Sequence, residues 1–228
     1  MDTLIKAFEM LFGGDPELRQ IIGVTLQMSF FSTSISSLLG IPLGVMIGAN
    51  EFHGKRWVQR ITNTLMGLPP VVAGLVVYLI LSRNGPLGTL MLLYTITAMV
   101  IAQVVLITPI ITGLTATIVS LRAPQIQETA AGMGFSRYKR MLYTVYECRM
   151  QFISVVMTGF GRSIAEVGAV QIVGGNIQYK TRIMTTAIMM QTNLGNFEFA
   201  VALGIILLLI SFVVNIIAQR LMEGNRRD

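Results

Sequence analysis

Long uncharged segments alternate with short charged ones along the chain. Ile21 to Asn50 contains no charged residue, and further uncharged runs extend from Ile61 to Ser82, from about Leu90 to Ser120 and from Phe199 to Gln219. A helix needs about 20 mainly apolar residues to cross the hydrocarbon core of a bilayer. Each of these four runs is therefore predicted to be one membrane-spanning helix.

Two other apolar regions are less regular. A further span, the fourth along the chain, is placed at about Met150 to Val173, although Arg162 and Glu166 interrupt it. The run from Ile183 to Phe197 is uncharged but short, and it is rich in Thr, Gln and Asn. It is predicted to be a partial helix, packed at the membrane mouth or re-entrant, because it is too short to cross. The predicted fold is an all-α polytopic membrane protein with five transmembrane helices plus this partial helix.

Composition supports the same class. Of the 228 residues, 53% are hydrophobic and only 12% are charged, which is too apolar for the water-exposed surface of a soluble domain. Cys148 is the single cysteine and His53 the single histidine. The sequence therefore excludes a disulfide within the chain and argues against a metal site built from Cys or His.

The ends of the chain are predicted to differ from its middle. Residues 1–20 are expected to form an interfacial segment, in which Leu4, Phe8 and Leu11 share one face of a short helix, and no cleaved signal peptide is recognised. A transmembrane permease domain is expected over residues 21–220, with a cytoplasmic tail at 221–228.

The distribution of basic residues sets the predicted orientation. Cytoplasmic loops of membrane proteins are enriched in Lys and Arg. With the carboxyl terminus inside, eleven basic residues fall in inside segments, against five outside. The inside set is Lys55, Arg56, Arg60, Arg122, Arg137, Lys139, Arg140, Arg149, Arg220, Arg226 and Arg227, and the outside set is Lys6, Arg19, Arg83, Lys180 and Arg182. We therefore expect an external amino terminus and a cytoplasmic carboxyl terminus.

A charged segment, Gln127 to Glu147, separates the third and fourth spans. Pro124 is suited to the first turn of a helix, Gly132 and Gly134 weaken or end one, and Ser136 is a good cap for the next. The pattern predicts two short cytoplasmic helices joined at a glycine elbow. On composition alone, a solvated connecting loop is the alternative.

The order of residues in this segment resembles a known motif. Glu128-Thr129-Ala130, then three residues, then Gly134, is similar to the EAA motif of ABC importer permeases, although Thr129 replaces the first Ala. The family's Ile-x-Leu-Pro ending is also replaced, here by Thr-Val-Tyr-Glu at 144–147. The resemblance implies that a coupling loop over residues 122–147 docks into a groove of a separate ATPase subunit. The residues that it assigns to coupling are Glu128, Thr129, Ala130, Gly134, Ser136 and Arg137.

Three further stretches extend the resemblance to most of the chain. Residues 68–79 (LPPVVAGLVVYL) and 82–88 (SRNGPLG) look like tungstate-type permeases of the molybdate/tungstate group. Residues 161–169 (GRSIAEVGA), followed by Gly175-Asn176-Ile177, are similar to a stretch of molybdate permeases. The resemblance implies a type I ABC importer permease fold in a prokaryotic plasma (inner) membrane, in a chain that is not itself an enzyme.

The resemblance also implies a set of partners. These are a second copy of the chain, a dimer of ATP-binding subunits that bind ATP-Mg, and an extracytoplasmic binding protein that delivers an oxyanion. Tungstate is the first expectation, with molybdate or sulfate as alternatives. No cofactor in this chain and no nucleic-acid partner are expected.

Arg162 and Glu166 lie one helical turn apart inside a predicted span. A charge at the bilayer centre costs about 2.5–3.5 kcal/mol on insertion scales, so the two are expected to pair or to face a polar cavity. The pair is either structural or part of the gate. With Gly168 and Asn176, these residues are the candidates for the pathway or gate, and no acid, base or metal ligand is assigned.

Gly40, Gly44 and Gly48 are spaced by four on the first span, and the small-residue face continues through Ser29, Thr33 and Ser37. In lipid, small residues let helix backbones approach closely, so this face predicts helix packing. Proline pairs and single prolines inside spans, at Pro69-Pro70 and Pro109, are expected to bend or break helices.

Residues 174–181 (GGNIQYKT) imitate a phosphate-binding loop, but Tyr179 stands where the second glycine is required. We therefore expect no nucleotide site in this chain. Lys180, Arg182 and Arg83 are predicted on the external side, either to attract a dianion or to serve as headgroup anchors or partner contacts.

Two other classes of function compete with the importer. An ion-coupled secondary transporter or channel needs intramembrane acidic residues, for which Glu166 is the candidate. A membrane scaffold without transport is the third reading, and the proline-broken spans argue against it.

Overall fold

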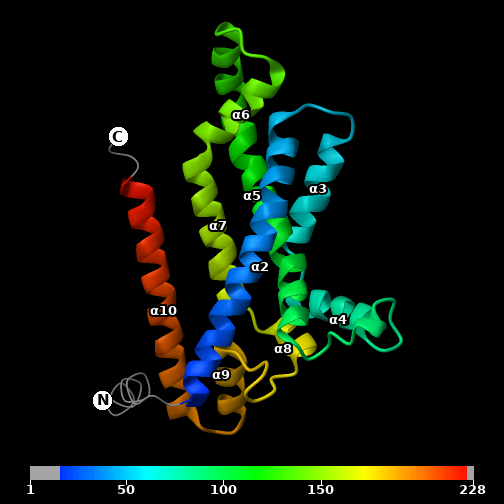
Figure 1. Ribbon diagram of the computed structural model, residues 1–228, viewed down its shortest axis with the longest axis vertical. Coiled ribbons are helices and arrows are strands. Elements are labelled where there is room, and N and C mark those ends of the chain that lie inside the picture. The colour runs from blue at the N-terminus through cyan, green and yellow to red at the C-terminus, as the bar shows by residue number, and fades with distance from the viewer. Residues whose placement is uncertain (1–15, 225–228) are drawn as a thin grey trace. The chain divides into compact units, whose positions relative to one another are not determined.

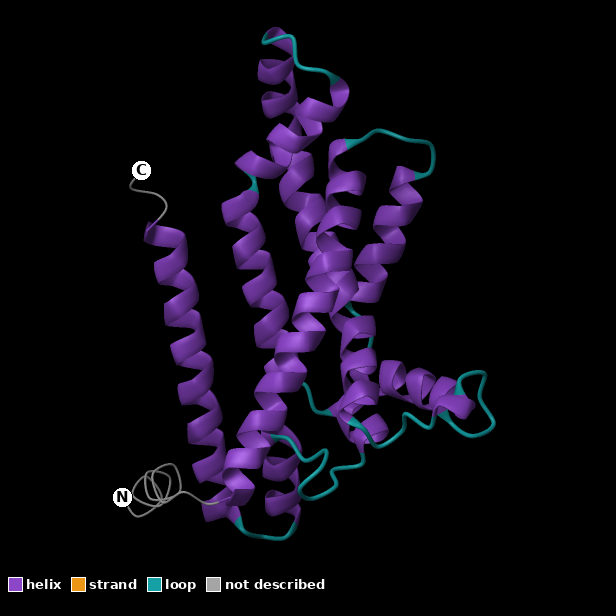
Figure 2. Cartoon of the chain, in the orientation of Figure 1, coloured by secondary structure: helices purple, strands orange, loops and turns teal. Residues whose placement is uncertain are grey.

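The computed structural model describes residues 16–224, and within that range all regular structure is helical (Figures 1 and 2). The elements are α2 (Pro16–Ala49), α3 (Lys55–Met66), α4 (Pro70–Leu81), the 3-10 turn η1 (Gly88–Leu90), α5 (Ile96–Gly132), α6 (Arg137–Glu147), α7 (Arg149–Ile164), α8 (Gly168–Gly174), α9 (Met184–Asn193) and α10 (Phe197–Gly224). The predicted all-α class is confirmed. The proposed face of Leu4, Phe8 and Leu11 lies outside the described residues.

Three described helices, α2, α5 and α10, are long and apolar enough to cross a membrane. The number rises to five when the broken pairs α3–α4 and α7–α8 are each counted as one crossing. Between the fourth crossing and α10, the short helix α9 occupies the place of the predicted partial helix. The sequence therefore predicted the positions of all five apolar regions, but it did not predict that two of them are each built from two helices.

The second predicted span is two helices rather than one. It begins at Lys55, earlier than expected, and α3 ends at Met66, after which α4 starts with Pro70 in its first turn. Pro69 is extended, with φ −61° and ψ 126°. A proline lacks a backbone N–H and disfavours helical geometry in the residue before it, so consecutive prolines break a helix. The break expected at Pro69-Pro70 is confirmed.

Pro109 behaves differently from that pair. It lies inside α5, which continues from Ile96 to Gly132 without interruption. Of the predicted bend or break at Pro109, the break is therefore wrong. The neighbouring residues Ile107 and Ile111 are almost fully buried in a core cluster, and their packing holds the helix on both sides of the missing N–H.

The fourth predicted span is also interrupted. Helix α7 ends at Ile164 and α8 begins at Gly168, so the break surrounds Glu166. Helix α8 ends at Gly174, and Gly175 follows in the left-handed region with φ 71°. The predicted end of this span near Val173 is confirmed, because the glycine at 175 adopts that conformation without steric cost.

The described chain divides into two compact units, and helices α2, α5, α7 and α10 contribute to both. The first unit comprises residues 16–32, 69–103 and 161–217, and the second comprises residues 33–68, 104–160 and 218–224. A core of the first unit is formed by Leu18, Ile21, Met184, Ala187, Leu203 and Ile206, where α2, α9 and α10 meet (Figure 1). A core of the second is formed by Val45, Val119, Ala123, Cys148 and Phe152.

Within the second unit, the small-residue face of α2 lies against α5. A Cβ atom added at Gly44 would approach the carbonyl oxygen of Thr112 to 2.7 Å, and one at Gly48 would approach that of Ala116 to the same distance. A step of four residues along α2, from Gly44 to Gly48, matches a step of four along α5, from Thr112 to Ala116. The two helices therefore run in the same direction in this unit. The helix packing predicted from the glycine spacing is confirmed.

Candidate functional site

The predicted coupling region begins as the end of a long helix. Helix α5 passes through Pro124 and ends only at Gly132, so the expectation that Pro124 opens a separate helix is wrong. Ala123 is buried in the core with Val119 and Phe152. Burial of the preceding turn offsets the roughly 3 kcal/mol by which an internal proline disfavours a helix.

The elbow itself follows the sequence closely. Gly134 has φ 74°, its N–H donates to the carbonyl of Ala131 at 2.9 Å, and the N–H of Phe135 donates to that of Ala130 at 3.0 Å. These bonds satisfy the last carbonyls of α5. Ser136 then caps α6, its hydroxyl oxygen accepting from the N–H of Lys139 at 3.5 Å. The glycine elbow and the capped second helix are confirmed.

The motif residues divide into exposed and buried ones. Glu128 and Thr129 are exposed, and the Thr129 hydroxyl donates to the carbonyl of Gln125 at 3.0 Å. Ala130 is fully buried, whereas Ser136 and Arg137 are exposed. Five of the six predicted coupling residues, Glu128, Thr129, Gly134, Ser136 and Arg137, are therefore exposed at the surface of the chain, and Ala130 packs within it.

An exposed stripe on α6 was not predicted. Tyr138, Leu142 and Tyr146 are spaced by four, which places them on one face, and they are 73%, 51% and 56% exposed. An adjoining face carries Met141 and Val145, which pack against the core of the second unit. The four-residue spacing is the signal that would have found this stripe in the sequence.

A cleft of about 620 Å³ adjoins this stripe in the second unit. The hydrogen bond from the Gln127 side chain to the carbonyl of Ala49, at 3.2 Å, ties the end of α2 to α5 beside it. The cleft is lined by Ala49, Asn50, Glu51, Gln127, Arg137, Tyr138, Arg140 and Met141. Among them, the sequence singled out only Arg137 as a coupling residue, because the others come together only when the helices fold.

The intramembrane pair forms within the first unit, but its two members differ. Arg162 Nη2 lies 3.6 Å from Glu166 Oε2, and their side chains are 46% and 6% exposed. Glu166 Oε1 also accepts from the N–H of Ala169 at 3.3 Å, and its carbonyl accepts from the Thr185 hydroxyl at 2.9 Å. Glu166 thereby anchors α8 and α9 to the end of α7.

The other two gate candidates lie nearby in sequence but make different contacts. A Cβ added at Gly168 would come within 3.1 Å of Val71 Cγ2, so α8 and α4 approach closely there. Asn176 is left-handed, with φ 50°, and its Nδ2 donates to Met190 Sδ at 3.5 Å. The structure groups Arg162, Glu166 and Gly168 at one break, and Asn176 belongs to the turn before α9.

Next to Arg162 in the chain, Ser163 belongs to a buried polar network that was not predicted from the sequence. The Ser32 hydroxyl donates to Gln103 Oε1 at 2.6 Å, and Gln103 Nε2 donates to the carbonyl of Ser163 at 2.9 Å. The Ser163 hydroxyl also bonds to Gln103 Oε1. All three residues are fully buried, and they join α2, α5 and α7 in the first unit. A glutamine inside an uncharged span was the available signal.

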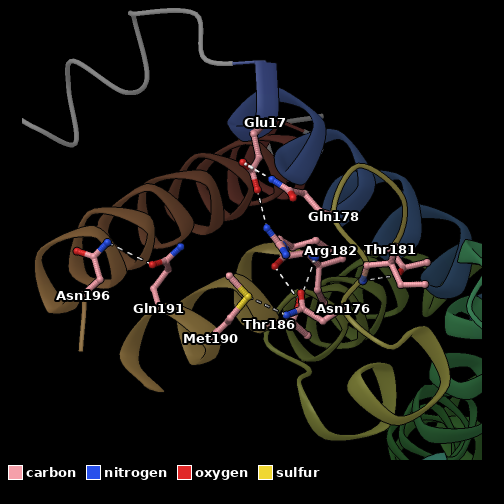
Figure 3. A network of polar contacts seen from close by, with 11 residues as sticks. Glu17, Asn176, Gln178, Thr181, Arg182, Thr186, Met190, Gln191 and Asn196 are labelled. Carbon is pink, nitrogen blue, oxygen red and sulfur yellow. Dashed lines mark hydrogen bonds and ion pairs between the residues drawn. The ribbon is translucent and has the colours of Figure 1, made fainter. Parts of the chain in front are cut away.

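A polar contact also fixes the start of α2 in the first unit. Arg182 Nη1 bonds to Glu17 Oε1 at 2.6 Å, and Gln178 Nε2 donates to Glu17 Oε2 at 2.9 Å (Figure 3). A guanidinium held this closely by a carboxylate contributes little net positive field. Three basic residues were predicted on the external side, either to attract a dianion or to serve as headgroup anchors or partner contacts, and of these Lys180 and Arg83 have exposed side chains.

Comparison with known proteins gives consistent matches over nearly the whole chain. Residues 40–227 match the family described as "Binding-protein-dependent transport system inner membrane component". The tungstate uptake system permease protein TupB of Peptoclostridium acidaminophilum is 40% identical over 217 residues, 95% of each chain. TupB of Campylobacter jejuni is 38% identical over 220 residues, 96% of this chain and 92% of that protein.

Two other matches broaden the comparison. A probable anion ABC transporter permease protein of Haloferax volcanii is 37% identical over 218 residues, 92% of this chain and 94% of that protein. Among solved structures, a bacterial ABC transporter involved in the import of the acidic polysaccharide alginate aligns with a TM-score of 0.75. That alignment covers 96% of this chain and 83% of the other at 20% identity, and it supports the fold.

Proposed function

The chain belongs to the family of binding-protein-dependent transport system inner membrane components, and we propose that the substrate it moves is tungstate. It is a permease of the ABC importer type, a transport subunit rather than an enzyme. Such a permease works in general with an ATPase and a binding protein. The observation that supports tungstate as the substrate is the sequence identity of 40% and 38%, over nearly the full length of the chain, to two tungstate uptake permeases.

Reconstitution tests the substrate directly. The chain is placed in proteoliposomes with its ATPase and its binding protein, and ATP hydrolysis is measured with tungstate, molybdate or sulfate. We expect tungstate to stimulate hydrolysis and to accumulate in the vesicles at the lowest concentration of the three. Stimulation by sulfate alone, or equal uptake without ATP, contradicts the proposal.

We also propose that the ATPase, which binds ATP-Mg, docks on residues 122–147 of each of two copies of this chain. The supporting observation is the exposed stripe of Tyr138, Leu142 and Tyr146, in the same segment as the exposed residues Glu128 and Thr129. Three large apolar or aromatic side chains exposed on one charged segment are typical of a surface that a partner covers.

Matched tyrosine variants test this docking. Tyr138→Ser removes a ring from the stripe, and Tyr179→Ser removes another well-exposed ring from the loop before α9. We expect the first variant, but not the second, to reduce copurification of the ATPase at least tenfold. An equal effect of both substitutions, or of neither, contradicts docking on this stripe.

The proposed orientation places the amino terminus outside and the carboxyl terminus in the cytoplasm of a prokaryotic plasma membrane. Because Cys148 is the single cysteine, Cys148→Ala gives a cysteine-free background. In it, Tyr138→Cys should react with a membrane-impermeant maleimide only from the cytoplasmic side, and Tyr179→Cys only from outside. The reverse labelling contradicts both the orientation and the docking.

A further inference from the structure

Two helices of the second unit place polar residues face to face around a pocket of about 210 Å³, here called the polar groove. Its lining residues are Ile47, Gln59, Thr62, Asn63, Gly113, Ala116, Thr117 and Ser120. Residues 59, 62 and 63 share one face of α3, and residues 113, 116, 117 and 120 share one face of α5, because each set follows helical spacing. The α5 residues belong to an uncharged membrane-spanning stretch.

The opposite face of α3 is apolar. Trp57, Val58, Ile61 and Leu65 are all exposed on it. Helix α3 is one half of a broken membrane crossing, and it has one apolar and one polar face. Such a helix is expected to direct its apolar face to lipid. The polar face then turns to the groove, where water or a polar ligand reaches it.

The groove presents hydrogen-bond donors that no other described residue uses. Among residues 16–224, the side chains of Gln59, Thr62 and Asn63 have no hydrogen-bond partner. Thr117 and Ser120 differ, because their hydroxyls donate to carbonyls of their own helix, those of Gly113 and Thr117, at 2.9 Å each. The α3 side therefore supplies two carboxamide groups and one hydroxyl that remain available to a ligand.

The chemistry of the lining favours a small anion that passes through. No carboxylate lines the groove to repel an anion, and no Lys or Arg lines it to hold an anion tightly. Conduction requires binding that is favourable enough to enter and weak enough to leave. A volume of 210 Å³ equals about seven times the roughly 30 Å³ that a water molecule occupies in the liquid. That is enough space for a tetrahedral oxyanion with part of its hydration shell.

We propose that the polar groove is a transient binding site for the transported oxyanion, whose oxygens accept hydrogen bonds from Gln59, Thr62 and Asn63. This inference rests on the proposed function and adds the contact residues to it. Residues 59–63 lie one to two turns from Lys55, at the predicted cytoplasmic end of α3. The groove therefore serves as a late station on the path, before release into the cytoplasm.

Neighbouring threonines give a matched test. Thr62 lines the groove, whereas Thr64 is exposed outside it and bonds to the carbonyl of Arg60. In the reconstituted complex, Thr62→Val and Asn63→Leu should each lower ATP-driven tungstate uptake about tenfold, the factor expected for one hydrogen bond to a charged group. Thr64→Val should stay within about twofold of the wild type. ATP hydrolysis without substrate should not change in any of the three.

The outcomes separate the two proposals. If the wild-type complex transports no oxyanion, the proposed function fails, and the groove fails with it. If the wild type transports tungstate while Thr62→Val and Asn63→Leu match it, only the groove is overturned. A parallel loss of uptake and of substrate-free ATP hydrolysis also overturns it, because such a loss reflects a structural role.

A second measurement reads binding without transport rates. On the Cys148→Ala background, Asn63→Cys should react with a negatively charged methanethiosulfonate, and tungstate supplied with the binding protein and ATP should slow that reaction. Thr64→Cys should show no such protection. Equal protection of the two positions, or protection of neither, contradicts a site at the groove.

Discussion

Alanine at position 44 tests how tightly α2 and α5 pack in the second unit. A Cβ atom at Gly44 would lie 2.5 Å from Thr115 Cβ and 2.7 Å from the carbonyl oxygen of Thr112. Ordinary contacts of a Cβ begin at about 3.4 Å, so the two helices must separate by roughly 0.9 Å. The Thr112 carbonyl is backbone and cannot rotate away, so the strain falls on the packing of both helices.

The magnitude follows from two opposing effects. Adding a methyl group to a well-packed interface costs about 1–3 kcal/mol, and a backbone contact places Gly44→Ala near the upper end. Replacing glycine by alanine in a helix returns about 1 kcal/mol. The net loss is about 2 kcal/mol, which corresponds to a melting temperature lower by about 4–8 °C for a chain of this size.

Gly23 provides the control on the same helix, because nothing lies within 4 Å of a Cβ added there. Gly23→Ala should therefore keep or raise the melting temperature. The thiol of Cys148 is fully buried and reacts with a fluorogenic maleimide only when the protein unfolds, so it reports melting in detergent. Equal shifts for Gly44→Ala and Gly23→Ala would refute the close approach of α2 and α5.

Three further outcomes are expected, each measured by thermal unfolding in detergent. Gln103→Leu removes the acceptor of the Ser32 hydroxyl and the donor to the Ser163 carbonyl, and it should cost about 1–3 kcal/mol, whereas full retention of stability contradicts the network. Arg182→Gln should lose about 1–2 kcal/mol, and Glu17→Gln combined with it should lose little more, because the two share one contact. Burial raises the pKa of the Cys148 thiol, so the unfolded chain releases its proton first. Stability should thus be full below the ordinary thiol pKa and fall as pH rises from there through the raised pKa of the folded protein, and Cys148→Ala should remove that slope, with tryptophan fluorescence as the readout.

Local chemistry made the helix ends predictable wherever one residue decides the backbone. Gly134 and Gly175 adopt left-handed angles that glycine tolerates, and Ser136 supplies a cap, so the elbow and the end of α8 followed from the sequence. The prolines were harder. Pro69 breaks a crossing and Pro124 does not, because Pro124 follows a turn that is buried in a core. Such burial depends on residues distant in the chain.

The candidate sites show the same division. The spacing of Arg162 and Glu166 predicted their contact, since residues four apart on a helix are neighbours. The polar groove was not predicted, because it requires one face of α3 to meet one face of α5. Neither face alone distinguishes a ligand site from a solvated surface. Sequence periodicity identifies such faces, and only the fold says what each of them meets.

The unequal members of the intramembrane pair bear on the choice between a structural and a gating role. Glu166 is almost fully buried, and its oxygens hold the N–H of Ala169 and the hydroxyl of Thr185, so its position is fixed by the folding of the first unit. Arg162 is nearly half exposed, and its contact with the Glu166 carboxylate is long, at 3.6 Å. A fixed counter-charge lowers the cost of keeping a guanidinium at membrane depth without covering its remaining donors. The structural role and the pathway role are therefore compatible: Glu166 carries the first, and Arg162 remains the candidate for the second.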